Sequence, residues 1–215
     1  MSAPRYRYIA IEGPIGVGTT SLTAMLARQF GAAELYEKVD DNPFLAKFYE
    51  DREKYALSTQ LFFLVSRYRQ LGEANQLNLF QKNVVADYML EKDLIFAELN
   101  LNSDEYEIYN EIYRHLSVNV ARPDLVIFLT AQTDRLIERV RMRGRDFESG
   151  ISEKYIKEVN EAYHRFFFRY DKGPMLQVNT NEIDFVKNKE DFQKLLDKIS
   201  SPVKGREFFN PLGST

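Results

Sequence analysis

The sequence contains no cysteine and only two histidines, His115 and His164, among its 215 residues. Without cysteine the chain can form no disulfide bond, no thiolate metal site and no cysteine nucleophile. Zinc enzymes usually bind their metal through several imidazole or thiolate groups, which this chain lacks. The composition therefore excludes cysteine chemistry and disfavours a zinc enzyme.

A surplus of positive charge and long apolar runs are also missing. The chain has 29 Lys and Arg against 32 Asp and Glu, a formal net charge of −3. Proteins that bind nucleic acid usually carry a clustered basic surface, so we expect small nucleotide ligands and no nucleic acid polymer. No stretch approaches the roughly 20 apolar residues of a membrane-spanning helix. We therefore expect a cytoplasmic protein without a membrane partner.

Short apolar runs alternate with longer helical patterns, which is typical of βαβ units and a parallel sheet. The predicted strands are Tyr6–Glu12, Glu34–Glu37, Asn83–Asp87, Asp124–Thr130 and Met175–Asn179. The predicted helices lie at about Thr20–Phe30, Pro43–Asp51, Ala56–Ala74, Ser103–Val120, Thr133–Arg143, Glu153–Tyr170 and Lys189–Ile199. Asn102 followed by Glu105 fits a capping box at the fourth of these helices. The sequence predicts one α/β domain over residues 1–200, with a five-stranded parallel sheet flanked by helices, and an irregular tail over 201–215.

A glycine-rich segment, GPIGVGTT at residues 13–20, lies between the first predicted strand and the first predicted helix. It fits the P-loop pattern of Gly, four residues, Gly, Lys and Ser or Thr, except that position 19 is threonine. The backbone N–H groups of such a loop surround phosphate oxygens, and the following helix N-terminus favours negative charge. The alternative is a glycine-rich turn that binds no ligand. The predicted phosphate-binding residues are Gly13, Gly16, Val17, Gly18, Thr19, Thr20 and Ser21, with the Thr20 hydroxyl also on Mg²⁺.

The threonine at position 19 bears on rate more than on fold. The lysine normally found there stabilises charge on the β- and γ-phosphates during transfer. Losing one preorganised electrostatic group typically costs about 3–4 kcal/mol, or about 100- to 1,000-fold in rate. We expect nucleotide binding with strongly reduced turnover unless another cation compensates. A protein deliberately inactivated by replacing the lysine at position 19 would have the same sequence.

Several segments together resemble the deoxynucleoside kinase family of deoxycytidine, deoxyguanosine and deoxyadenosine kinases, above all its bacterial purine-type members. They are YEKVDDNPFLAKFYED, TQLFFLVSRYRQ, DYMLEKDLIFA, RGRDFESGI and VNTNEIDF, within a resemblance that spans roughly Tyr6 to Ile199. The resemblance implies a three-layer domain of the P-loop NTPase type and transfer of the ATP γ-phosphate to the 5′-hydroxyl of a deoxynucleoside. It also implies Mg²⁺ and a homodimer. The preferred base, and ATP against GTP as donor, stay open.

Glu37 ends the second predicted strand, at the sheet edge where α/β proteins bind ligands. The resemblance implies that it is the general base for the 5′-hydroxyl; an exposed loop glutamate is the alternative. In the helix at 56–74, Gln60, Phe63 and Arg67 share one face by their spacing. The resemblance gives Gln60 and Arg67 contacts to the nucleobase, whereas a solvent-facing polar stripe is the alternative. The apolar face of this helix is predicted to be Leu61, Leu64, Val65, Tyr68 and Leu71.

The remaining acceptor and metal residues rest on the resemblance. Tyr49 and Glu148 match contacts to the sugar 3′-hydroxyl, although Tyr49 could equally be a core aromatic. Asp93 corresponds to a base-reading aspartate. Asp87 ends a predicted strand and would support Mg²⁺ through water. The family carries arginine after this carboxylate, and Tyr88 in its place removes a second positive charge.

Four arginines, at 139, 141, 143 and 145, resemble the family's lid at about 139–151. Arginines that close over the donor stabilise transition-state charge. We expect Arg143 and Arg145 to act catalytically, Arg139 to bind the donor, and this group to compensate for Thr19. A solvated basic helix end is the alternative. The resemblance places Asp184 and Phe185 at the adenine of ATP; a buried loop phenylalanine is the other interpretation.

Two other functions compete with a deoxynucleoside kinase. Loss of charge at Thr19 and Tyr88 favours a nucleotide-binding regulatory protein with negligible catalysis. A nucleoside monophosphate kinase would need an extra basic subsite for its acceptor, and the acceptor residues named above are mostly neutral or acidic. A GTPase is disfavoured because the sequence has no Asn-Lys-x-Asp motif.

Overall fold

The computed structural model describes residues 6–78, 83–145, 148 and 150–212. Its centre is a sheet of six parallel strands in the order β2-β3-β1-β4-β5-β6. The strands are β1 (Tyr8–Glu12), β2 (Ala33–Leu35), β3 (Val84–Ala86), β4 (Leu125–Thr130), β5 (Met175–Asn179) and β6 (Arg206–Phe209). The expected α/β fold is therefore confirmed, with one strand more than predicted.

The additional strand, β6, comes from the tail that was predicted to be irregular. It pairs with β5, with Met175 opposite Arg206. Four residues between Gly205 and Asn210 are too short for a period to be recognised, and the strand forms because β5 offers a free edge. The Arg206 Nη2 also donates hydrogen bonds to the carbonyl oxygens of Phe167, Phe168 and Tyr170, at 2.7, 2.9 and 3.0 Å. The tail is thus bound to the sheet and to the end of the helix that precedes β5.

Helices flank this sheet as a parallel α/β fold requires. They are α1 (Thr19–Phe30), α2 (Leu45–Glu50), α3 (Arg52–Asn78), α4 (Lys92–Asn100), α5 (Ser103–Ser117), α6 (Thr133–Arg143), α7 (Glu153–Arg169) and α8 (Lys189–Ser200), with a 3₁₀ turn at Val39–Asp41. Helix α4 was not predicted. Its apolar residues are consecutive rather than spaced by a helical turn, and its N-cap residue Glu91 makes no side-chain capping bond.

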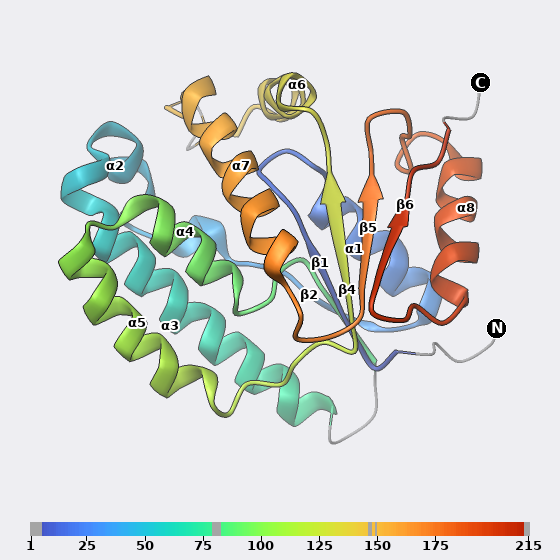
Figure 1. The fold of residues 1–215 in the computed structure, drawn as a ribbon, viewed down its shortest axis with the longest axis horizontal. Coiled ribbons are helices and arrows are strands. Elements are labelled where there is room, and N and C mark those ends of the chain that lie inside the picture. Colours follow the sequence, from blue (N-terminus) through green and yellow to red (C-terminus); the bar gives the residue numbers. More distant parts are fainter. Residues whose placement is uncertain (1–5, 79–82, 146–147, 149, 213–215) are drawn as a thin grey trace.

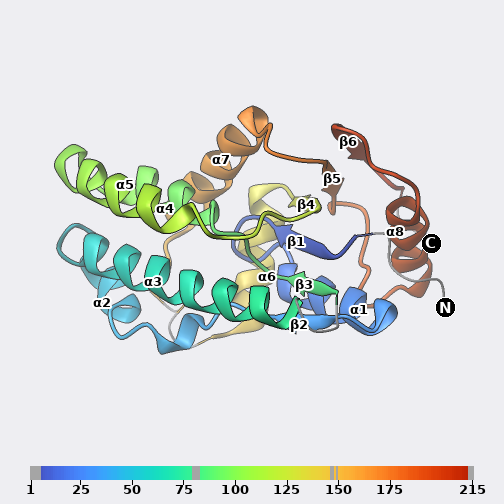
Figure 2. The same cartoon turned by 90° about the horizontal axis from the view of Figure 1, so that it is seen from below.

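Alternate residues of the central strand β4 face opposite sides of the sheet. Val126 and Phe128 belong to a core shared with α3, α4, α5 and α7. Leu125, Ile127 and Leu129 belong to a second core, shared with α1, α6 and α8. In Figures 1 and 2 the helices α3, α4 and α5 lie together to one side of the strands, while α8 lies at the other end of the sheet. Strand β4 is covered on both faces, as its sequence predicted.

The capping box at the start of α5 is present. Asn102 Oδ1 accepts from the Glu105 N–H at 3.0 Å, and Glu105 Oε2 accepts from the Asn102 N–H at 3.1 Å. We expect Asn102→Ala to lower the free energy of unfolding by about 1 kcal/mol, because the Glu105 N–H in the first turn loses its side-chain acceptor. Urea denaturation measures this. Asn119→Ala, at an exposed position just beyond the same helix, is the control, and equal effects of both changes would contradict the prediction.

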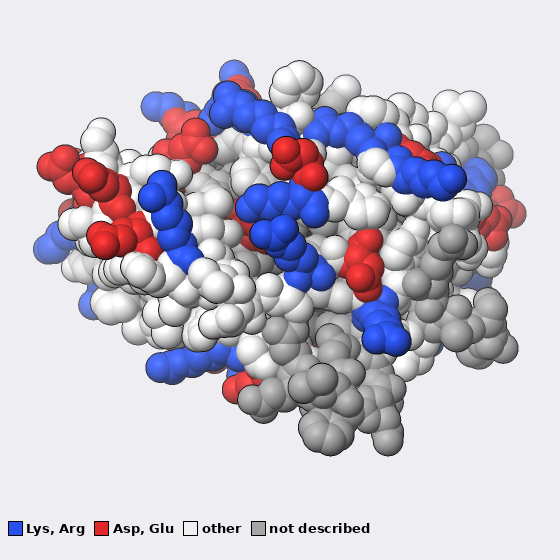
Figure 3. Space-filling model, turned by 60° about the horizontal axis from the view of Figure 1, so that its bottom comes forward, with Lys and Arg blue, Asp and Glu red and all other residues white. Residues whose placement is uncertain are grey.

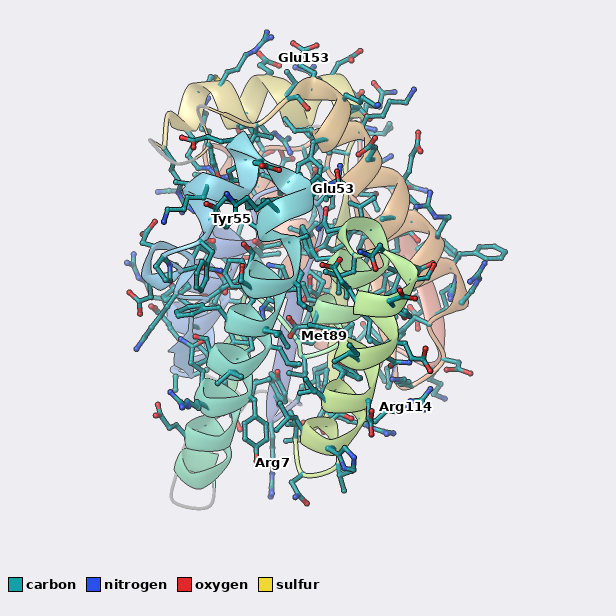
Figure 4. All side chains as sticks on the ribbon, turned by 90° about the vertical axis from the view of Figure 1, so that its left-hand side faces the viewer. Arg7, Glu53, Tyr55, Met89, Arg114 and Glu153 are labelled. Atoms are coloured by element: carbon teal, nitrogen blue, oxygen red, sulfur yellow. The ribbon has the colours of Figure 1, made fainter. Side chains whose placement is uncertain are left out.

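The helices α3 and α7 begin at the end of the molecule where the strands finish. Figure 4 shows Glu53 and Glu153, in the first turns of these helices, at the opposite end from Arg7, which precedes β1. Loops that follow the strands and the first turns of these helices therefore meet at one edge. Within the described residues, no helix is long and apolar enough to cross a membrane.

Candidate active site

A cleft of about 780 Å³ opens at this edge, a volume typical of small-molecule sites. The glycine loop and Glu37 both line it, as does Arg67. Of the residues predicted from the sequence, those that line the cleft are Gly13, Gly16, Val17, Gly18, Thr19, Thr20, Ser21, Glu37, Tyr49, Gln60, Phe63, Arg67, Asp87, Arg139, Arg143, Arg145, Glu148, Asp184 and Phe185. Asp93 lies behind this lining. Glu37 and the glycine loop therefore line one cleft whose size suits a small-molecule ligand.

The backbone of the glycine loop adopts a conformation in which residues other than glycine would be strained. Gly16 and Gly18 have φ angles of 87° and 106°, in the left-handed region that favours glycine. A Cβ on Gly13 would lie 2.7 Å from the carbonyl oxygen of Leu129, closer than packing allows. Gly18 is the N-cap of α1, so the loop leads directly into a helix N-terminus that faces the cleft. This arrangement suits an anion, and phosphate above all.

Asp87 connects the glycine loop to the Glu37 segment. Its Oδ2 accepts from the Thr20 hydroxyl at 2.9 Å, and its Oδ1 accepts from the Glu37 N–H at 2.8 Å. Burial raises the pKa of Asp87, and the charge of Lys92 opposes this shift. Within the described ranges, no group of three or more His, Cys, Asp or Glu side chains is arranged to hold a metal ion. The oxygen pair of Thr20 and Asp87 still fits Mg²⁺, which binds through one or two protein oxygens, phosphate oxygens and water.

The Glu37 carboxylate is held between two cations. Arg67 Nε donates to Oε1 at 2.9 Å, with a second bond from Nη2, and Lys92 Nζ donates to Oε2 at 2.6 Å. Burial alone would raise the pKa of Glu37, but the charges of Arg67 and Lys92 outweigh burial and lower it to about 2. Glu37 is therefore fully ionised at neutral pH, and both of its oxygens are engaged.

Arg67 is buried between two carboxylates. Its Nη1 bonds Asp93, its other nitrogens bond Glu37, and its guanidinium lies 4.9 Å from the centre of the Phe63 ring. Asp93, predicted to read the base, therefore acts on Arg67 in this structure. A buried guanidinium needs such pairing, because an unpaired charge away from water is costly.

The polar side of α3 faces the cleft, which contradicts the solvent-facing alternative. Gln60 and Arg67 are 2% and 3% exposed. The predicted apolar face is wrong at Val65, which is 37% exposed. The Gln60 Oε1 is buried and, among the described atoms, has no hydrogen-bond partner. Gln60 thus brings an amide with unused hydrogen-bonding capacity to the wall of the cleft.

Tyr49 and Glu148 lie near each other at one end of the cleft. Burial raises the pKa of Tyr49, and the negative charge of Glu148 raises it further. A Cβ on Gly150 would lie 3.2 Å from the Tyr49 Cβ, so the predicted lid segment packs on α2. The ring of Tyr49 also makes edge contacts with Phe48 and Tyr155. Tyr49 therefore packs on other aromatic rings, as the core-aromatic interpretation held, and it also lines the cleft.

The arginines of the predicted lid differ in what they contact. Arg139 Nη1 donates to the Thr180 hydroxyl at 3.1 Å and to the Val17 carbonyl at 3.4 Å, which ties α6 to the glycine loop. Arg143 pairs with Glu148. Arg141 pairs with Glu153 at the exposed surface. Of the lid segment, residues 146, 147 and 149 lie outside the described residues.

The loop after β5 reaches the glycine loop from the other side. Phe185 is 4% exposed, and a Cβ on Gly18 would lie 3.3 Å from its ring. Asp184 Oδ1 accepts from the N–H groups of Val186 and Lys187 at 3.1 and 3.0 Å. Phe185 is therefore buried against the loop, as the alternative interpretation held, and it also lines the cleft.

Lys92 lines the cleft and was not among the predicted site residues. The only sequence signal was its position five residues after Asp87, within DYMLEKDLIFA. Because helix α4 was not predicted, no expected element directed the Lys92 side chain toward Glu37. Tyr88, noted for replacing an arginine, is fully buried and donates from its hydroxyl to Gln70 Oε1 at 2.8 Å.

A parallel sheet with a glycine loop between β1 and α1, and a cleft at the carboxyl edge, defines a protein of the P-loop NTPase fold.

Charge is not concentrated on the face drawn in Figure 3, where described Lys and Arg side chains are interspersed with Asp and Glu.

Comparison with known proteins gives the family. The model of the deoxynucleoside kinase family matches residues 9–204, and the chain belongs to that family. It is 36% identical over 202 residues to deoxyguanosine kinase of Bacillus subtilis, covering 91% of this chain and 97% of that protein. It is 29% identical to deoxyadenosine kinase of Lactobacillus acidophilus, covering 91% and 96%. The structure of deoxyadenosine kinase from M. mycoides with bound dATP has a TM-score of 0.79 and 28% identity, covering 91% of this chain and 100% of that one.

Proposed function

We propose that this protein transfers the γ-phosphate of ATP to the 5′-hydroxyl of a deoxynucleoside, with a purine deoxynucleoside or deoxycytidine as acceptor. The observation that carries the proposal is the shared cleft. The glycine loop and Glu37 line the same cavity and are joined through Asp87, so a phosphate on the loop and a hydroxyl at Glu37 lie next to each other. The names of the relatives, deoxyguanosine and deoxyadenosine kinases, support the acceptor class.

In the proposed reaction the Glu37 carboxylate accepts the proton of the 5′-hydroxyl as that oxygen attacks the γ-phosphate. The glycine loop binds the phosphates of the donor through its N–H groups. Thr20 and Asp87 would hold Mg²⁺, which when bound neutralises phosphate charge. Arg143 and Arg145 close over the donor, and Asp184 and Phe185 contact its adenine.

The acceptor is oriented from α2, α3 and the segment after α6. Gln60 offers a free carbonyl oxygen to an amino group on the base edge. Tyr49 and Glu148, which both line the cleft, would bind the sugar 3′-hydroxyl. Arg67 and Phe63 complete this side of the cleft. The expectations of a homodimer and a cytoplasmic location rest on the sequence alone.

Phosphorylation of all four deoxynucleosides, each with ATP and with GTP, tests the proposal. We expect deoxyguanosine, deoxyadenosine or deoxycytidine to have the highest kcat/KM, because an amino group on each base can donate to Gln60. Thymidine has no exocyclic amino group, and a clear preference for thymidine would overturn the acceptor assignment.

A nucleotide-binding regulatory protein is the second candidate, favoured by the threonine at position 19. Single-turnover mixing of ATP with deoxyadenosine separates the two functions. Binding of both ligands without any transfer would support regulation, and measurable transfer would support the kinase.

A further inference from the structure

Lys92 is the first residue of α4, and its side chain reaches into the cleft. A lysine in the first turn of a helix opposes the helix dipole, so stability of α4 does not explain this residue. The side chain is only 15% exposed and its Nζ bonds Glu37 Oε2 at 2.6 Å. Such burial of an ammonium group is favourable only with negative partners.

The surroundings keep Lys92 charged. Burial lowers its pKa, but the carboxylates of Glu37 and Glu12 raise it, and the net shift is upward. Glu12, at the end of β1, is itself engaged by the Met89 N–H at 2.8 Å and by the Tyr163 hydroxyl at 3.2 Å. Glu37 is therefore the acceptor to which the ammonium is bound, through one of its oxygens.

A chain of hydrogen bonds connects Lys92 to the glycine loop. Lys92 bonds Glu37, the Glu37 N–H bonds Asp87, and Asp87 bonds the Thr20 hydroxyl of the glycine loop. Glu37 and Asp87 therefore lie between Lys92 and the glycine loop in this chain of hydrogen bonds. A lysine side chain carries a compact charge on a flexible stem of about four carbons, so it can change partners without moving the backbone.

Three other cations of the cleft are held by more contacts or are more exposed than Lys92. Arg67 bonds both Glu37 and Asp93, and Arg139 bonds Thr180 and Val17. Lys187 lies at the rim, 82% exposed, beside Asp184. Lys92 is buried in the cleft and donates a hydrogen bond to Glu37, whereas position 19 of the loop carries no charge.

We propose that Lys92 supplies the cation that the glycine loop lacks: its ammonium leaves Glu37 Oε2 for the γ-phosphate of the bound donor, and the freed oxygen takes the 5′-hydroxyl. This inference rests on the proposed kinase function. The acceptor oxygen forms the new bond to the γ-phosphorus, the bond from that phosphorus to the β–γ bridging oxygen breaks, and ADP leaves. The hydroxyl proton passes to Glu37. Lys92 stabilises the charge on the transferring group.

A double-mutant cycle of Lys92→Met and Thr19→Lys tests the assignment. We expect Lys92→Met to lower kcat by about 100- to 1,000-fold, with a much smaller change in the Kd of the deoxynucleoside. If a lysine at 19 and Lys92 stabilise the same charge, their effects are not additive. Thr19→Lys should then raise kcat at least about tenfold more in the Lys92→Met background than in the native one.

Lys172→Met is the matched control, because Lys172 lies 3.7 Å from Glu91, the neighbour of Lys92, and does not line the cleft. It should leave kcat unchanged. Circular dichroism and binding of the deoxynucleoside check that Lys92→Met is folded. A folded Lys92→Met with native kcat, or equal effects of Thr19→Lys in both backgrounds, would overturn the role of Lys92. Absence of transfer by the native protein with every deoxynucleoside would instead overturn the proposed function.

Discussion

Replacement of Glu37 by glutamine is expected to lower kcat by about 100- to 10,000-fold, the range that general base catalysis contributes. Glutamine keeps the shape of the side chain but cannot accept the proton of the 5′-hydroxyl. Initial rates with saturating ATP and deoxyguanosine or deoxyadenosine measure the effect. Dissociation constants for both ligands show whether the loss lies in catalysis or in binding.

The control for this change is Glu34→Gln, three residues before Glu37 in the same segment. Glu34 is exposed on β2 and does not line the cleft, and its carboxylate accepts from the hydroxyl of the cleft residue Tyr36 at 2.8 Å. Because Glu37 also neutralises Arg67 and Lys92, thermal unfolding must accompany the kinetics. A folded Glu37→Gln protein with native kcat would exclude Glu37 as the base.

Thr19→Lys is expected to raise kcat, with an upper limit of about 100- to 1,000-fold set by the worth of one preorganised charge. Thr19 is the first residue of α1 and lines the cleft, so a lysine there extends to the β- and γ-phosphates. If Lys92 already offsets part of the loss, the gain in the native background falls below that limit. Steady-state kcat at saturating ATP is the measurement.

Thr19→Met serves as the control for side-chain length, since it adds a long chain without charge. It should not raise kcat. An unchanged kcat in Thr19→Lys, with ATP binding intact, would show that the threonine imposes no loss of turnover.

The sequence was sufficient where one segment carried its own signal. The continuous apolar run of β4, the glycine loop and the Asn102 capping box each depend on local chemistry, and each was predicted close to its observed position. Strand β6 and helix α4 depend on what they pack against. A strand of four residues at Arg206–Phe209 has no recognisable period and forms only because β5 has a free edge.

The same distinction holds in the candidate site. Glu37 and the glycine loop are placed at one edge by topology alone, which a strand pattern reveals. The ion pairs of Glu37 with Arg67 and Lys92 join segments 30 and 55 residues apart. No local pattern encodes such pairs, so the sequence indicated Arg67 as a base contact and left Lys92 unassigned.

The Arg206 guanidinium donates hydrogen bonds to three carbonyl oxygens at the end of α7. The segment that carries Arg206 therefore holds the end of α7 in place. Removing residues from 206 onward would leave those carbonyls without their donor and open the β5 edge to another strand. Helix α7 carries Tyr155 and Tyr163 into the cleft lining. A shortened chain would therefore risk aggregation and loosen one wall of the cleft, although the deleted segment touches no predicted ligand.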